Sequence, residues 1–179
     1  MGSEMCIRDR PTMVVAHLAG ALGLDVLDGH ERAAALHPLV SLPDADIGAE
    51  RLAGGAWFAV AGDPLVRQVV DDLGGHAFAV ADIDRTRYHA AAVIASNHLV
   101  ALLGQVERVA PEGVPLEAFL GLARGTIENV AALGAAAALT GPVARGDWAT
   151  VERHLAALPE DERPAYEAMV AEARRLIGS

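Results

Sequence analysis

The sequence predicts an α/β segment followed by an all-helical segment. Up to Asp84, short apolar runs alternate with turn residues and a brief helical pattern, whereas from Arg85 onward the pattern is helical throughout. Strands that alternate with helices are typical of a mostly parallel sheet covered on its faces. We therefore expect residues 11–84 to be the edge of a Rossmann-type parallel sheet and residues 85–179 to form a helical substrate or dimerisation domain.

The elements follow in order along the chain. Strands are expected at Met13–His17, Trp57–Ala61 and Ala77–Ala81, where β-branched, aromatic and small apolar residues lie between turn signals. A helix is expected at Pro64–Leu73, with Asp63 as its N-cap and Pro64 in the first helical position. Proline and glycine then separate four further helices, expected at roughly 85–110, 115–132, 147–158 and 161–177.

The first ten residues, MGSEMCIRDR, do not read as part of a folded domain. Their codons can be written as a stretch that resembles a transposon-based sequencing adaptor, and no apolar core of a signal peptide precedes a cleavage site. We expect this segment to be an artefact and the natural N-terminus to be missing. Cys6 is the only cysteine, so the remaining chain has no thiol for disulfide, metal or nucleophilic chemistry.

Composition excludes several partners. The net charge is −10 and the pI is about 5.0, which argues against nucleic acid and anionic membrane, because both require basic surfaces. No apolar run is expected to span a membrane, and we expect a cytoplasmic protein. The sequence has no lysine, which removes mechanisms that depend on a lysine base or Schiff base.

The first long helix carries an unusual set of polar residues. Tyr88 and His89 stand in its first turns, and Ser96, Asn97 and His98 follow one another in its middle. Such residues lower helix propensity, so something else must hold them there. One interpretation is that they hydrogen-bond to neighbouring helices, and the other is that they line a cleft for a carbonyl or carboxylate substrate.

Three loops hold further candidates. His37 precedes Pro38 after an apolar run, and His17 lies with Gly20 at the end of another strand, an edge where ligands of α/β domains bind. Histidine is also suited to proton transfer near neutral pH. The loop from Thr140 to Asp147 offers Arg145 to a carboxylate or phosphate, and Asp147 is expected to cap the next helix. The histidine spacings match no metal-binding motif, so no metal site is expected.

These residues together carry a family resemblance. The runs YHAAAVIASNHLVALL, LTGPVARGD, HLAGALGLDVL and LHPLVSL resemble Rossmann-like bacterial proteins with a C-terminal domain of unknown function 2520. That region is similar to the helical domain of 6-phosphogluconate dehydrogenase. The resemblance implies a preceding dinucleotide-binding portion with its glycine-rich loop, which is absent from this sequence, so the fragment alone is expected to be inactive. Prephenate dehydrogenases resemble the chain at His89, at Ser96 to His98 and at His37.

The resemblance implies an NAD(P)-dependent oxidoreductase that acts on a small carbonyl, imine or hydroxy acid, with NADP or NAD as cofactor. Expected catalytic residues are His89, Asn97, His98 and His37; expected substrate-binding residues are Ser96, Tyr88, Arg145 and Thr140; expected cofactor-binding residues are His17 and Gly20. A homodimer is expected as well, since alanine-rich helices pack closely. The alternative is a non-catalytic module for oligomerisation or metabolite sensing.

Overall fold

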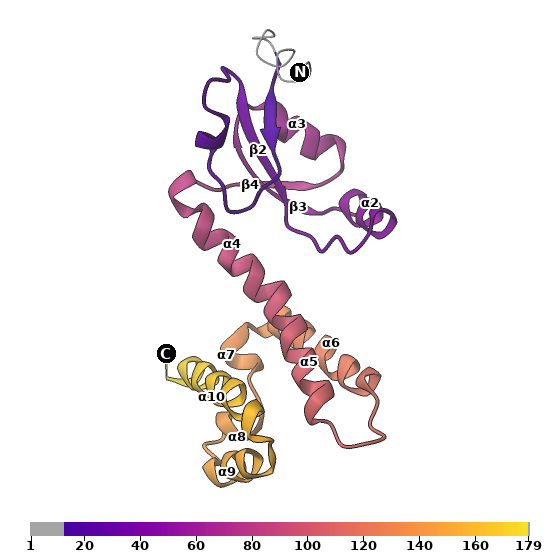
Figure 1. Cartoon of the computed structure of the whole chain (residues 1–179), viewed down its shortest axis with the longest axis vertical. Coiled ribbons are helices and arrows are strands. Elements are labelled where there is room, and N and C mark those ends of the chain that lie inside the picture. The colour runs from indigo at the N-terminus through magenta and orange to yellow at the C-terminus, as the bar shows by residue number, and fades with distance from the viewer. Residues whose placement is uncertain (1–12, 179) are drawn as a thin grey trace. The chain divides into compact units, whose positions relative to one another are not determined.

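The computed structural model describes residues 13–178, so the adaptor-like segment and Cys6 lie outside the described residues. The chain divides into two compact units, Met1–Leu99 and Val100–Ser179, which we call unit 1 and unit 2. The division falls within a long helix (Figure 1), fifteen residues beyond the point where the sequence pattern changes from strands to helices.

Unit 1 contains the four strands of the molecule's described part and the helices that connect them. In order these elements are β1 (Val15–His17), η1 (Leu24–Leu27), β2 (Ala33–Pro38), α2 (Ala45–Ala53), β3 (Trp57–Gly62), α3 (Leu65–Asp72), β4 (His76–Ala79), η2 (Asp82–Asp84), α4 (Arg85–Val93) and the π-helix η3 (Ile94–His98). The three predicted strands and the predicted helix at 64–73 are confirmed, with ends that differ by up to two residues.

Two predictions about this unit need correction. His37 does not lie in a loop but inside β2, where it pairs with Ala59 of β3. The sheet has the order β1-β2-β3-β4, and although β1 and β2, like β3 and β4, are parallel, β2 and β3 are antiparallel. An apolar run looks the same in either direction, so the sequence pattern could not reveal this reversal.

The two faces of the sheet have different characters. Ala34, Phe58 and Val60 form the hydrophobic core with Val66 and Val70, which lie one turn apart on α3. Successive side chains of a strand point to opposite faces. The residues between these core positions therefore lie on the other face, which carries His37, Trp57 and Phe78.

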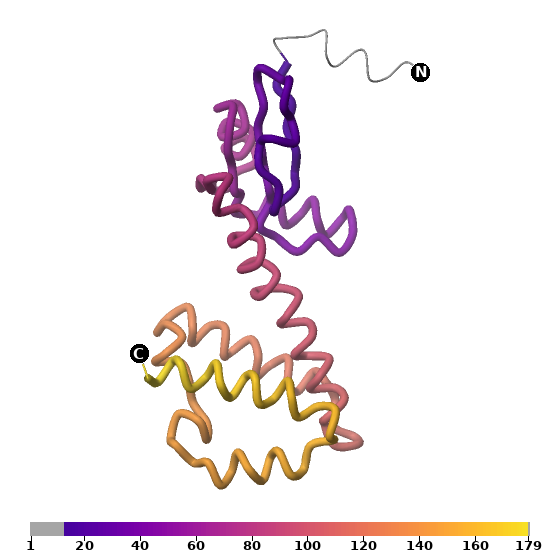
Figure 2. Tube along the Cα trace, turned by 60° about the vertical axis from the view of Figure 1, so that its left-hand side comes forward, coloured from indigo at the N-terminus to yellow at the C-terminus, as the bar shows by residue number. Residues whose placement is uncertain are grey.

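Unit 2 is helical (Figure 2). Its elements are α5 (Leu99–Val109), α6 (Leu116–Leu133), α7 (Ala135–Ala138), α8 (Gly141–Ala144), α9 (Trp148–Ala157), η4 (Glu160–Glu162) and α10 (Arg163–Ile177). The predicted helices are confirmed, and the fold class of a Rossmann-type sheet edge followed by a helical region is confirmed with them. The short helices α7 and α8 were not predicted.

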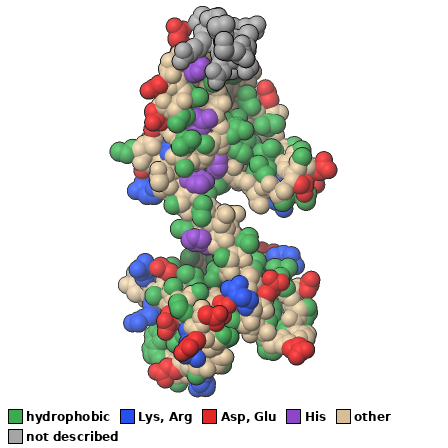
Figure 3. Space-filling view, in the orientation of Figure 1, with side chains coloured by type: hydrophobic (Ala, Val, Ile, Leu, Met, Phe, Trp, Pro, Cys, Tyr) green, Lys and Arg blue, Asp and Glu red, His purple; other side chains and the backbone are tan. Residues whose placement is uncertain are grey.

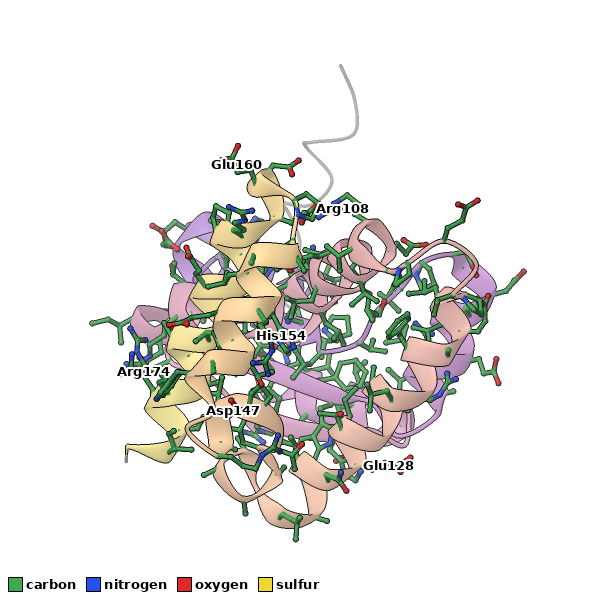
Figure 4. All side chains as sticks on the ribbon, turned by 90° about the horizontal axis from the view of Figure 1, so that it is seen from below. Arg108, Glu128, Asp147, His154, Glu160 and Arg174 are labelled. Atoms are coloured by element: carbon green, nitrogen blue, oxygen red, sulfur yellow. The ribbon has the colours of Figure 1, made fainter. Side chains whose placement is uncertain are left out.

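Two local interactions order unit 2. Asp147 caps α9 as predicted, because its carboxylate accepts hydrogen bonds from the backbone N–H of Thr150 (3.1 Å) and from the Thr150 hydroxyl (2.7 Å). Arg108 of α5 donates to the buried Glu162 carboxylate, and Gln105 donates to the Glu162 carbonyl at 2.9 Å. The bonds to Glu162 hold η4 against α5; Figure 4 labels Arg108 of α5 and Glu160 of η4.

One continuous helix, Asp82–Val109, is long and apolar enough by composition to cross a membrane, with a mean hydropathy of 1.3. This differs from the expectation that no apolar run has that length. A single helix of this kind is weak support for a membrane span, because core helices of soluble proteins meet the same criteria.

Candidate active site

His37, Tyr88 and His89 meet on the sheet face opposite α3. The Tyr88 hydroxyl lies 2.7 Å from His37 Nδ1, and the rings of His37 and His89 stand edge to face with centroids 5.9 Å apart. Together with Gly20, which packs against both histidine rings, we call this group the His37 cluster. Figure 3 shows histidine side chains gathered on one face of unit 1.

Strand register explains how Tyr88 reaches His37. Ala59 pairs with His37 on one side and with Phe78 on the other, so these three residues form a row across the sheet. Ala59, the middle residue of this row, is completely buried and small. The Tyr88 ring contacts the two larger residues on either side of Ala59, with centroid distances of 5.6 Å to His37 and 5.7 Å to Phe78. Because the side chain of Ala59 is only a methyl group, there is room above it for the Tyr88 ring.

Gly20 closes the cluster from the β1 side. A Cβ atom at this position would lie 2.6 Å from His89 Cδ2 and 2.8 Å from His37 Nε2, closer than real Cβ atoms approach other groups. Only glycine therefore allows the backbone after β1 to come this near to both rings. The predicted contact between Gly20 and a cofactor stays a prediction.

Burial sets the protonation states of the pair. Desolvation lowers the pKa of His37 below its usual value, and the charges of His89 and Arg85 lower it further. Desolvation also raises the pKa of Tyr88, an effect that Arg85 partly opposes. At neutral pH both side chains are therefore neutral, and the bond joins them in one of two ways: the Tyr88 hydroxyl donates to Nδ1 with the imidazole hydrogen on Nε2, or Nδ1–H donates to the hydroxyl oxygen.

Arg85 is a functional candidate that the sequence reasoning missed. It stands three and four residues before Tyr88 and His89, on the same helix face, and it is 1% exposed. Its nearest carboxylate oxygen, Asp82 Oδ1, is 3.9 Å from Nε. The i, i+3, i+4 spacing with Tyr88 and His89 was the signal that could have identified it.

His17 has a local structural role in unit 1. Its Nδ1 accepts a hydrogen bond from the Ala19 N–H at 3.2 Å, and its Nε2 lies 3.0 Å from the Gly23 carbonyl oxygen. Both ring nitrogens thus hold the loop that contains Gly20. The predicted contact between His17 and a cofactor stays a prediction.

Ser96, Asn97 and His98 form most of the π-helix η3 and are exposed. π-Helical turns inside α-helices occur frequently at functional sites, so the residues predicted from their low helix propensity do mark an irregularity. Asn97 follows His89 by eight residues, about 12 Å along a helix. The structure therefore separates this group from the His37 cluster rather than joining them.

Thr140 and Arg145 belong to unit 2, where both are exposed beside α8. Their predicted substrate contacts stay predictions. Unit 2 also contains a second pair of the same kind: His154 Nδ1 lies 2.7 Å from the Tyr166 hydroxyl, with ring centroids 5.9 Å apart, and His154 is labelled in Figure 4. A His–Tyr pair is thus not diagnostic alone; the first pair differs in its second histidine, its close glycine and its buried arginine.

Comparison with known proteins places the chain in a family. The family model described as a domain of unknown function, DUF2520, matches residues 58–173. No curated protein matches the chain. Three crystal structures share the fold. Protein TM1727 from Thermotoga maritima is 28% identical, with a TM-score of 0.75 over 91% of this chain and 68% of its own.

The other two structures are more distant in sequence. Protein BF3122 from Bacteroides fragilis, described as a proposed NADP oxidoreductase, is 20% identical with a TM-score of 0.77, over 93% of this chain and 66% of its own. Pyrroline carboxylate reductase from Plasmodium falciparum, solved with NADP bound, is 14% identical with a TM-score of 0.54, over 91% of this chain and 71% of its own. The chain thus spans about two thirds of the length of these proteins.

Proposed function

Because the chain belongs to the family of the domain of unknown function DUF2520, we propose that it is part of an NAD(P)-dependent oxidoreductase acting on a small carbonyl, imine or hydroxy acid. The observation that carries the proposal is the His37 cluster, in which two histidines and a tyrosine lie within contact distance on one sheet face. The names of BF3122 and of the Plasmodium reductase agree with this reaction class.

In this proposal His37 and His89 handle the proton and Tyr88 orients His37. When the Tyr88 hydroxyl donates to Nδ1, neutral His37 presents an N–H at Nε2, which can donate to an oxygen or nitrogen of the substrate. Asn97 and His98 stay proposed catalytic residues, and the proposed substrate-binding residues stay Ser96, Tyr88, Thr140 and Arg145. His37 is the better candidate for the acid or base, because its environment shifts its pKa.

The cofactor would be NADP or NAD, with predicted contacts at His17 and Gly20. Within residues 13–178, no strand-to-helix turn carries the G-x-G-x-x-G sequence that binds a pyrophosphate. The described residues do not fit a whole dinucleotide, so beyond the proposed contacts at His17 and Gly20 we assign to them only the substrate and the proton. The cofactor would accept or donate the hydride. A cytoplasmic location is part of the same proposal.

The test begins with the gene sequence upstream of the Pro11 codon. The chain is expressed with whatever that sequence encodes and titrated with NADPH and NADH by nicotinamide fluorescence, and small keto and imino acids are then screened for turnover. Alanine substitutions of His37, His89 and His98 should each reduce kcat, by about 10²- to 10⁴-fold where the histidine acts as acid or base. His154→Ala, which removes the matching exposed pair with Tyr166, is the control and should leave kcat unchanged.

Failure has a clear form. If neither nucleotide binds a correctly folded protein, the oxidoreductase proposal is wrong and the module for oligomerisation or sensing becomes the better interpretation. If turnover is found but all three histidine variants retain it, the assignment of the histidines is wrong while the reaction class stands.

A homodimer is proposed for unit 2, because α6 has no buried residue although it is eighteen residues long. Leu122 is 70% exposed, and Ile127 and Leu133 are 54% and 61% exposed. Exposed apolar surface on one helix is typical of an interface between subunits. Leu122→Glu should shift the mass measured by light scattering from dimer to monomer, whereas Glu117→Gln on the same helix should not; a wild-type monomer would contradict the proposal.

A further inference from the structure

Arg85 is the only side chain in the described part of the chain whose buried polar atoms have no hydrogen-bond partner. Its Nε, Nη1 and Nη2 are all shielded from solvent and unbonded. Glu162, the other buried charged residue among those described, is instead bonded to Arg108. Burying a guanidinium without hydrogen-bond acceptors costs the free energy of removing a full charge from water. Buried charges in folded proteins are therefore rarely left without a partner or a ligand.

The surroundings of Arg85 contain no anion in bonding contact. Asp82 approaches Nε only to 3.9 Å, and its other carboxylate oxygen accepts a hydrogen bond from the Leu24 N–H at 3.1 Å. The remaining neighbours on the helix face are Tyr88 and His89, and the charge of Arg85 lowers the pKa of His37. Among the described residues, the guanidinium therefore has one long ion pair with Asp82 and no hydrogen-bond acceptor.

We propose that Arg85 and the His37 cluster form a binding site for a small carboxylate, which pairs with the guanidinium while the histidines face the adjoining carbon. Arginine presents parallel N–H groups that match the two oxygens of a carboxylate, and this pairing strengthens where water is excluded. The inference rests on the proposed function in one respect: it assigns the carboxylate to the substrate of that reaction.

The loop after β1 forms the cover of this site. Gly20 contacts His37 and His89, and Gly23 and Leu24 contact Asp82, so the segment Gly20–Leu24 touches neighbours of Arg85 on both sides. In this proposal the carboxylate enters where this segment meets α4. The occupant that we propose is short, a keto, imino or hydroxy acid, because the segment packs closely against the histidine rings at Gly20.

The alternative explanation is that Arg85 stabilises the fold, and the two explanations predict opposite results for Arg85→Met. An unpaired buried charge destabilises a protein, so a methionine of similar length should preserve or raise the urea midpoint of unit 1. A guanidinium that holds the fold together would lower that midpoint when removed. Tryptophan fluorescence of Trp57 in a Trp148→Phe background reports unit 1 alone.

Binding is measured directly on this chain by NMR of the histidine imidazoles. Acetate and oxalate are titrated at constant ionic strength, with chloride as the control ion and inorganic phosphate as the competing anion; the His37→Asn spectrum assigns the His37 signal. We expect saturable shifts of the His37 and His89 signals with the carboxylates, at least tenfold weaker binding in Arg85→Met, and an intermediate affinity in Arg85→Lys. Arg87→Met, which removes an 85% exposed arginine of the same helix, should bind as wild type does.

Four results would overturn the proposal: no saturable shift with either carboxylate, shifts with phosphate alone, unchanged affinity in both Arg85 variants, or a large fall in the unit 1 midpoint in Arg85→Met. The carboxylate titration does not depend on nicotinamide binding. Failure of the oxidoreductase proposal and failure of the carboxylate site are therefore separate outcomes.

Discussion

Replacing Gly20 by alanine tests whether the backbone after β1 packs against the His37 cluster as described. The new Cβ would lie 2.6 Å from His89 Cδ2 and 2.8 Å from His37 Nε2, whereas ordinary contacts begin near 3.4 Å. One of the rings or the loop must therefore move by more than half an ångström. His37 cannot yield freely, because Tyr88 holds its Nδ1 at 2.7 Å.

Overpacking of this kind typically destabilises a protein by about 1–3 kcal/mol. We expect Gly20→Ala to lower the urea midpoint of unit 1, followed by Trp57 fluorescence in a Trp148→Phe background. Gly121→Ala on α6 is the control, and it should change stability in the opposite direction. Its Cβ would have no other atom within 4 Å, so alanine should stabilise unit 2 by about 0.5–1 kcal/mol. Trp148 reports that unit.

A Gly20→Ala midpoint equal to or above that of the parent would refute the packing argument, because it would mean that the loop does not approach the two rings. The imidazole NMR signals give a second reading of the same question. Those of His37 and His89 should shift in Gly20→Ala, and that of His154 in unit 2 should remain in place.

Three further outcomes are expected. Tyr88→Phe removes the hydrogen bond to His37 and should destabilise unit 1 by about 0.5–1.5 kcal/mol in urea denaturation, more than Tyr166→Phe destabilises unit 2, because the second pair is exposed. Burial lowers the pKa of folded His37, so unit 1 should lose stability as the pH falls from about 6.5 toward that lower value, and the loss should shrink in His37→Asn. The hydrogen bond from Arg108 lowers the pKa of Glu162, so unit 2 should lose stability as the pH falls below about 4.3, and thermal melts of Glu162→Gln should show a flatter pH dependence.

The helical half could be predicted from the sequence because proline, glycine and caps mark its boundaries. Asp147 is an example: an acidic residue after a glycine and before an apolar period predicts an N-cap, and its contact with Thr150 is local. The strands at 57–61 and 77–81 were predictable for a related reason, since β-branched and aromatic residues concentrate there. Helix caps and strand propensities depend on residues that are close in the sequence, so they can be predicted from the sequence alone.

The site was less predictable because its contacts are distant in sequence. His37 and Tyr88 are 51 residues apart, and half of strand β2 is alanine, which has low strand propensity. The sequence named His37, Tyr88 and His89, which the structure brings together, and also Asn97 and His98, which lie farther along the helix. Arg85 was missed because burial of a charge depends on tertiary packing, and no motif announces it.

The row His37–Ala59–Phe78 gives a practical criterion for sorting relatives of this chain. The site depends on the small side chain of Ala59, because a valine, leucine or phenylalanine at residue 59 would fill the space of the Tyr88 ring. A relative with a bulky residue there should have lost the tyrosine contact even if every polar residue is retained. Alanine or glycine at the position of residue 59 therefore identifies the relatives that can keep the tyrosine contact, and it does so from the sequence alone.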